Sequence, residues 1–307
     1  ATGHEVFMNS FIPVILDEIL RDYQLSPPSA RDAKVLSFFA SAISTLKDLI
    51  SKDVPRIMEA VFEKTLEIIT KNMEDHPEHR VNFFLFLRQA NSHCFYGLFS
   101  IPAAHQKMVV ESIIWAVKHT ERNISETGLE ILLELLQNVG NNPSIAQSFY
   151  SSFLLSIVQD IFGVLTDRLH KSGFKLQASL LKHLCNITEL GQVTVPLHPM
   201  ASIDNSTFLK EHIATLLLSA FPNLGRSQVV SFVRGLFDVS LDLISFKQHL
   251  RDFLIVVKEF ATEDNADLYL EEVEAEKAAR SQAEEEYLAS VPGLRRPQDI
   301  DFDPDLQ

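Results

Sequence analysis

Residues 125–143 read SETGLEILLELLQNVGNNP and contain the pattern that is repeated along most of the chain. Their apolar residues recur three and four positions apart, at Leu129, Leu132, Leu133, Leu136 and Val139. This spacing places the side chains on one stripe of an α-helix. Asn142 and Pro143 then provide a capping candidate and a proline suited to a first helical turn. The stretch therefore predicts one amphipathic helix that ends shortly before a second one begins.

The same arrangement occurs at several other places in the sequence. Prolines stand ahead of long apolar-periodic stretches at Pro28, Pro55, Pro77, Pro102 and Pro143. Polar residues that could cap helices lie beside four of these prolines, at Asp53, Asp75, Ser100 and Asn142. Apolar stripes follow at residues 58–69, and two more occur at 209–220 and 246–257. Recurrent units of this kind predict stacked helical hairpins.

The spacing predicts a lone helix at 5–23 and five helix pairs after it. The pairs are 31–50 with 54–72, 77–98 with 103–120, 124–139 with 143–169, 174–190 with 205–221, and 226–238 with 242–261. Each pair spans roughly forty residues, the size of a HEAT-type unit. We therefore expect an all-α HEAT-repeat solenoid of stacked antiparallel helix pairs, without a sheet. The longest connection, 191–204, is predicted to be a loop with a possible contact function.

Composition agrees with a folded helical protein. Of the 307 residues, 46% are hydrophobic and only 10 are glycine, which argues against disorder and against a turn-rich β-protein. No apolar run approaches the roughly 18 residues that span a bilayer, so no membrane association is expected. Cys94 and Cys185 are far apart in apolar helical settings, which favours free thiols in a reducing compartment. Because Ala1 is not an initiator methionine, we expect a piece of a longer protein.

Negative charge is concentrated at the C-terminal end. The chain has a net charge of −14, of which residues 263–307 carry −10 and the first 262 residues only −4. An acidic end disfavours direct nucleic-acid binding and suits a basic protein partner. We therefore divide the chain into a repeat arc at 1–262, an acidic helix at 263–287 and an acidic tail at 288–307.

The acidic helix is the candidate regulatory feature of the chain. Its glutamates are Glu271, Glu272, Glu274, Glu276, Glu284, Glu285 and Glu286. Like charges on one short helix repel one another, so the helix gains little stability from its own charges. The bland interpretation is a solvated terminal helix. The functional interpretation is an arm that docks elsewhere on the full protein, near basic side chains of other repeats, or that competes with a partner.

No other motif in the sequence indicates catalysis or metal binding. His76 and His79 could meet on a helix, but no third metal ligand lies nearby, and a polar helix start is the better interpretation. No phosphate loop, zinc-protease motif or nucleophile elbow is present in the sequence, so neither an enzyme nor a cofactor is predicted. Trp115 lies in an apolar helix and is expected in or near the core. The basic cluster around Lys118, His119 and Arg122 is interpreted as a solvated face.

Several strings resemble a known family over nearly the whole chain. They include PEHR at 77–80, NSHCF at 91–95, SIIWA at 112–116, LLQNV at 135–139, AQSFY at 146–150, HLRDFL at 249–254 and SVPG at 290–293. In this order they resemble the C-terminal repeats of the exportin-1 family of importin-β-like nuclear export receptors. Residues 1–10, 191–204 and 294–307 carry no matching motif.

The resemblance implies a receptor built of HEAT repeats in a ring. Such a receptor carries cargo with leucine-rich export signals out of the nucleus, together with the GTPase Ran in its GTP form. It shuttles between nucleus and cytoplasm and meets nucleoporins on the way. The segment seen here would close the ring, add contacts to Ran and carry an autoinhibitory acidic helix. The export-signal groove and its reactive cysteine would lie upstream, so neither Cys94 nor Cys185 would match that cysteine.

The alternative is a HEAT-type structural scaffold or regulatory subunit with no transport role. Both readings predict the same stacked helices and no catalytic residues. A scaffold should ignore the nucleotide on Ran, whereas a transport receptor should require GTP.

Overall fold

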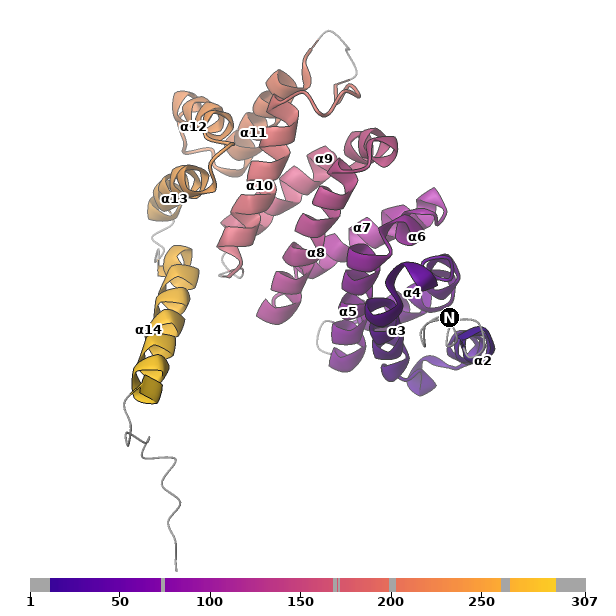
Figure 1. Ribbon diagram of the computed structural model, residues 1–307. Coiled ribbons are helices and arrows are strands. Elements are labelled where there is room, and N and C mark those ends of the chain that lie inside the picture. The colour runs from indigo at the N-terminus through magenta and orange to yellow at the C-terminus, as the bar shows by residue number, and fades with distance from the viewer. Residues whose placement is uncertain are drawn as a thin grey trace, which may run out of the picture.

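A computed structural model describes residues 12–72, 75–167, 170, 172–198, 203–260 and 266–290. Within these ranges the chain forms thirteen α-helices and no strand, which confirms the predicted all-α repeat fold. Figure 1 shows the helices following one another as a curved two-layered array, with the last helix leaving it at one end. The predicted tail beyond Ser290 and the first residues of the predicted helix at 5–23 lie outside the described ranges.

The helices begin and end close to the predicted positions. They are α2 (Ile12–Leu25), α3 (Lys34–Leu46), α4 (Val54–Ile69), α5 (Pro77–His93), α6 (Phe95–Phe99), α7 (Ala103–Val117), α8 (Arg122–Gly140), α9 (Pro143–Thr166), α10 (Phe174–Glu189), α11 (Asn205–Ala220), α12 (Arg226–Asp238), α13 (Leu243–Phe260) and α14 (Leu270–Ser290). The predicted helix at 77–98 is interrupted at Cys94, whose backbone leaves the helical region at φ −136° and ψ 38°. Short 3₁₀ turns occur at Pro28–Ala30, Lys47–Ile50 and Ala266–Tyr269.

Helices alternate between two layers. In one layer α3, α5, α8, α10 and α13 succeed one another. In the other, α2, α4 and α6 are followed by α7, α9 and α11. Contacts between elements are therefore local in the sequence, as in other solenoids.

The pairing of helices differs in part from the predicted one. Three predicted pairs are in contact, namely α8 with α9, α10 with α11, and α12 with α13. For the first two predicted pairs, closer backbone approaches are instead those of α4 to α5 and of α7 to α8, although Phe84 of α5 stacks on Trp115 of α7. Apolar periodicity shows that a helix has a buried face, but it does not show which neighbour covers that face.

Prolines begin three helices as predicted. Pro55, Pro77 and Pro143 stand in the first turn of α4, α5 and α9, where their missing N–H has no partner to lose. Pro102 occupies the position just before α7, and Pro28 begins only a 3₁₀ turn.

The predicted side-chain caps were wrong. Asp53 and Asn142 occupy the cap positions of α4 and α9 without a capping hydrogen bond, and His76 and Pro102 stand where Asp75 and Ser100 were expected to act. Asp204 does cap a helix, because it accepts a 2.9 Å hydrogen bond from the Thr207 N–H at the start of α11.

The apolar stripes form one continuous core between the layers. Leu129, Leu132 and Leu136 of α8 are fully buried. Trp115 packs against this core and stacks on Phe84 with ring centroids 6.1 Å apart, as expected for a near-core residue. By length and composition alone α9 could cross a membrane, but half of its apolar window is buried against other helices of the protein. Its apolarity is thus accounted for by its place between α7, α8, α10 and α11.

One fully buried arginine joins two successive repeats. Arg80, at the start of α5, has no exposed surface. Its Nη2 donates to the backbone oxygens of Asn72 and Asp75 in the α4–α5 connection, at 3.2 and 2.8 Å. Across the repeat boundary its Nη1 lies 3.9 Å from Glu121, and its guanidinium lies 5.9 Å from the Trp115 ring centroid. Burial of this charge is offset by the two hydrogen bonds of Nη2 and by the nearby carboxylate, while Nε and Nη1 have no hydrogen-bond partner among the described residues.

Candidate functional site: the docking site of the acidic helix

The acidic helix α14 is attached to the arc just before its first turn. The 3₁₀ turn Ala266–Tyr269 leads into it, and Leu268 in this turn is 5% exposed. Arg251, on α13, donates from Nη2 to the Leu268 backbone oxygen at 3.1 Å. The Arg251 guanidinium also lies 4.3 Å from the Tyr269 ring centroid and 5.1 Å from that of Phe174 on α10. An apolar anchor and a cation–π stack therefore fix where α14 begins.

Glu272 forms the first charged contact of the helix itself. Its Oε1 accepts hydrogen bonds from Lys247 Nζ and Arg251 Nη2, both at 2.7 Å. The two cations are four residues apart on α13, which places them on the same face. Burial alone would raise the pKa of the Glu272 carboxyl, but the hydrogen bonds from Lys247 and Arg251 outweigh it and lower the pKa to about 2.

Glu274 forms the second charged contact, with α8 rather than with α13. Arg122, the first residue of α8, donates from Nη1 and Nη2 to the two carboxylate oxygens at 2.7 and 2.6 Å. This fork geometry is the strongest form of an arginine–carboxylate pair. Hydrogen bonding from Arg122 lowers the pKa of Glu274, and hydrogen bonding to Glu274 and Glu126 raises that of Arg122.

The remaining predicted glutamates do not join these contacts. Glu276 and Glu286 are exposed and form no ion pair with the described part of the chain. Glu271, Glu284 and Glu285 belong to α14, but their side chains lie outside the described ones. Figure 1 shows α14 extending away from the arc beyond its first turns. The helix is thus held at its N-terminal end, and its acidic C-terminal half faces solvent where it is described.

The docking contacts are reversible in character. The side chains of Glu272, Glu274 and Arg122 are each exposed by 41–48%, so water and salt can compete for the Arg122–Glu274 pair in particular, whereas Lys247 and Arg251 opposite Glu272 are more covered. Exposed ion pairs contribute at most about 1 kcal/mol each. The arrangement can hold a helix and release it, and the described groups offer no nucleophile with an acid or a base beside it.

The sulfur and imidazole groups show no sign of reactivity. Cys94 and Cys185 are free and buried, and burial raises their pKa values to about 11 and 12. Thiols of this kind are poor nucleophiles. The rings of His76 and His79 lie 5.6 Å apart, and His79 Nε2 is hydrogen-bonded to the Arg31 carbonyl at 2.8 Å. Within the described ranges no three histidine, cysteine or acidic residues gather where a metal ion could bind.

Sequence reasoning missed the basic half of the site. It placed Arg122 in a solvated cluster and gave Lys247 and Arg251 no role. A sequence signal for Lys247 and Arg251 was available. They are two cations four residues apart on the helix that directly precedes the strongly acidic one. No sequence signal connects Arg122 with Glu274, which lies 152 positions further along the chain.

Comparison with known proteins identifies the family to which the chain is similar. The family profile described as CRM1 C terminal matches residues 1–262. Exportin-1 of Drosophila melanogaster is 43% identical over 304 residues, which cover 99% of this chain and 28% of that protein. Protein EXPORTIN 1B of Arabidopsis thaliana is 44% identical over 298 residues, 95% of this chain and 27% of the relative. Exportin-1 of Schizosaccharomyces pombe is 43% identical over 301 residues, 96% of this chain and 28% of the relative.

The chain thus spans less than a third of the length of these relatives. The profile and the relatives agree along nearly all of it, and they agree with the helical array described above. The chain therefore belongs to the exportin-1 family, of which it represents the CRM1 C-terminal region.

Proposed function

We propose that the chain is the C-terminal arc of a nuclear export receptor that carries leucine-rich export-signal cargo together with GTP-bound Ran. The observation that carries the proposal is its identity of 43% with an exportin-1 over 99% of its own length. Residues 1–262 would form the arc, 263–287 the acidic helix and 288–307 the acidic tail. In the full receptor the arc would close the ring and add contacts to Ran. The receptor would shuttle between nucleus and cytoplasm and bind nucleoporins.

The acidic helix is proposed to act as a brake on cargo binding in the absence of Ran. Its docking contacts support this role, because α14 is held through two glutamates, Glu272 and Glu274, rather than by burying its own surface, and the Glu274 pair with Arg122 is exposed. A state that disfavours cargo by about 1.4 kcal/mol would lower the apparent affinity about tenfold. A helix held by contacts of this size can be displaced when a partner binds.

The brake is tested by removing residues 263–307 from the full-length receptor. Cargo carrying an export signal should then bind more tightly without Ran, and Ran-GTP should give a smaller additional gain. Charge reversal at the docked Glu272 and Glu274 should have part of this effect. Reversal at the unpaired Glu276 and Glu286 is the matched control and should have less. Equal cargo affinity of the truncated and intact receptors at low and moderate salt would refute the brake.

The transport role is tested separately, by a pull-down of the full-length receptor with Ran in its GTP and GDP forms. A receptor should retain Ran-GTP with cargo and release Ran-GDP, whereas a scaffold should ignore the nucleotide. The 307-residue chain alone should not bind a fluorescent export-signal peptide saturably, because the apolar groove for such peptides would lie upstream. Micromolar saturable binding would mean that the groove is assigned to the wrong part of the protein.

A further inference from the structure

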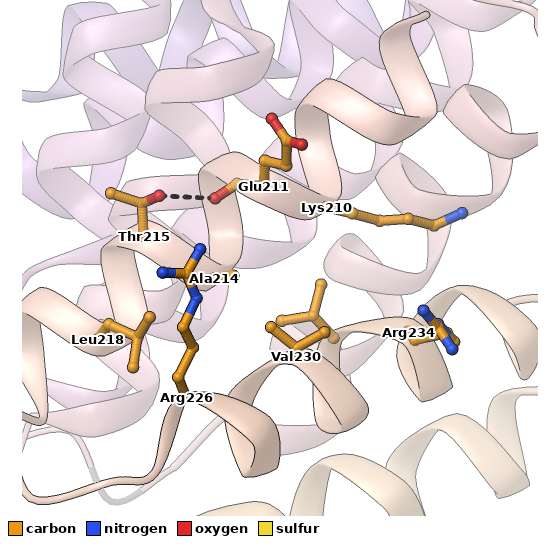
Figure 2. A pocket seen from close by; sticks show the side chains of 9 residues that line it. Lys210, Glu211, Ala214, Thr215, Leu218, Arg226, Val230 and Arg234 are labelled. Atoms are coloured by element: carbon orange, nitrogen blue, oxygen red, sulfur yellow. Dashed lines mark hydrogen bonds between the residues drawn. The ribbon is translucent and has the colours of Figure 1, made fainter.

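A second charged surface lies at the other face of the array, between α11 and α12. These helices border a hollow of about 390 Å³, large enough for a few side chains of a ligand. Figure 2 shows it from close by. We call this hollow the α11–α12 groove, with Lys210, Ala214 and Leu218 on α11 and Arg226, Val230 and Arg234 on α12.

The α12 side of the groove has a regular chemical pattern. Arg226, Val230 and Arg234 are four residues apart, so they share one face of the helix. All three are exposed, and Val230 retains 41% of its accessible surface although it lies between two charged groups. In Figure 2, Arg226 extends across the groove towards α11, and Val230 lies between Arg226 and Arg234. Along this face of α12 a cation, an apolar side chain and a second cation therefore follow one another.

The two arginines have no countercharge within the described part of the chain. Lys210 is already neutralised, because it is paired with Glu189 at 2.9 Å and lies 4.6 Å from the Phe237 ring centroid. Glu211 is the one carboxylate that lines the groove, and it forms no ion pair with Arg226 or Arg234. In a chain with a net charge of −14, these two arginines beside an exposed valine form a local positive surface that favours an anionic partner.

We propose that the α11–α12 groove binds an acidic amphipathic peptide segment of a partner protein. Its apolar side chain would rest on Val230 and Leu218, and carboxylates on either side of it would pair with Arg226 and Arg234. Eight residues of helix separate the two arginines by about 12 Å, so a helical ligand would need acids about four positions before and after its apolar anchor. Charge complementarity selects this partner over an apolar one, since the described cations would otherwise be covered without a countercharge.

The test uses the 307-residue chain and a fluorescent probe peptide. The probe is a 15-residue alanine-based helix with a central leucine and glutamates four positions before and after it. A second peptide with glutamine in place of the glutamates measures the contribution of charge. We expect saturable binding of the acidic probe that weakens at high salt, and much weaker binding of the glutamine peptide.

Variants of the groove locate the binding. Arg226→Ala and Arg234→Ala should each weaken binding by up to about fivefold, which is the effect of losing one exposed ion pair. The double charge reversal Arg226→Glu with Arg234→Glu should abolish it. The exposed Arg21→Glu on α2 is the matched control and should have little effect. Unfolding curves establish that the groove variants remain folded, as expected because both arginines are exposed.

Three outcomes would overturn the proposal. The first is the absence of saturable binding at low salt, and the second is binding that ignores the groove variants or the loss of the glutamates. The third is binding that appears only after residues 291–307 are removed, because the acidic end of the chain itself would then be the occupant. Neither Ran nor export cargo enters this experiment, so its result is independent of the proposed transport role.

Discussion

Helices α8 and α14 have similar lengths but are held to the protein by different forces. In α8 the stripe that includes Leu132 and Leu136 is fully buried between neighbouring helices. In α14 the described contacts are an anchor just before its first turn and the ion pairs of two glutamates, and Val273 on the helix itself remains 45% exposed. Burial is insensitive to salt and mild acid, whereas exposed ion pairs respond to both. We therefore expect the docking of the acidic helix to respond to solution conditions that leave the arc unchanged.

The sharpest test of this contrast truncates one apolar side chain in each helix. Leu132→Ala should lower the free energy of unfolding of the arc by about 2–5 kcal/mol, because it leaves a cavity in a fully buried site. Val273→Ala should change it by no more than about 0.5 kcal/mol. Urea unfolding followed by circular dichroism measures both. Similar losses for the two variants would show that α14 is part of the core.

A smaller effect is expected from two glycines inside arc helices. A Cβ at Gly128 of α8 would lie 2.7 Å from the Val117 nitrogen and 2.8 Å from the Ala116 Cβ on α7. Gly128→Ala should therefore cost about 1–3 kcal/mol through overpacking. Gly163 of α9 has nothing within 4 Å of that position, so Gly163→Ala should stabilise by about 0.5–1 kcal/mol. Thermal unfolding checks the opposite signs, and a stabilising Gly128→Ala would contradict the close approach of α7 and α8.

Docking of α14 should depend on Arg122, whereas the folding of the arc should not. Arg122→Ala removes the paired hydrogen bonds to Glu274, so amide hydrogens of α14 should exchange severalfold faster. Raising the salt concentration to 1 M should act in the same direction, because screening shortens the Debye length to about 3 Å. Arg88→Ala, which breaks the similarly exposed 3.0 Å pair with Glu130, is the control and should leave α14 unchanged. Unaltered exchange in α14 after Arg122→Ala would mean that this pair does not hold the helix.

The smallest expected effect is a response to acid. The pKa of Glu272 is lowered from 4.5 to about 2, so its contribution to docking is complete above about pH 4.5 and is lost as the pH falls towards 2. The carbon-13 shift of its carboxyl group should titrate near pH 2, and Lys247→Met should move the midpoint upwards. Docking should not change between pH 5 and 8 through this group. A midpoint near 4.5 in the unaltered chain would show that Glu272 is not paired in solution.

Local pattern was enough to predict the helices and the family, but not their partners. The stripe from Leu129 to Val139 and the prolines at 55, 77 and 143 placed α8 and the starts of three helices within a few residues. The break at Cys94 was not predicted, and neither was the contact that follows it, in which Gly97 packs against the Ser51 carbonyl so closely that a Cβ would lie 2.5 Å from it. Charge density predicted seven glutamates, of which Glu272 and Glu274 form the docking contacts, and the family match confirms the predicted exportin-1 family. Arg122 could not be joined to Glu274 because long-range ion pairs leave no local periodicity.

The buried Arg80 links two connections of the arc. Its guanidinium is held by two backbone carbonyls of the α4–α5 connection and faces Glu121 at the next connection along the array. Because the Arg80 guanidinium is shielded from water, its hydrogen bonds to the two carbonyls should respond little to ionic strength or mild acid, although Glu121 itself is half-exposed. In a solenoid each repeat contacts only its neighbours, so the shape of the array follows from such contacts between successive repeats. Solution conditions that release the acidic helix would therefore leave the bend of the arc unchanged, so that the two parts of the molecule can be tuned independently.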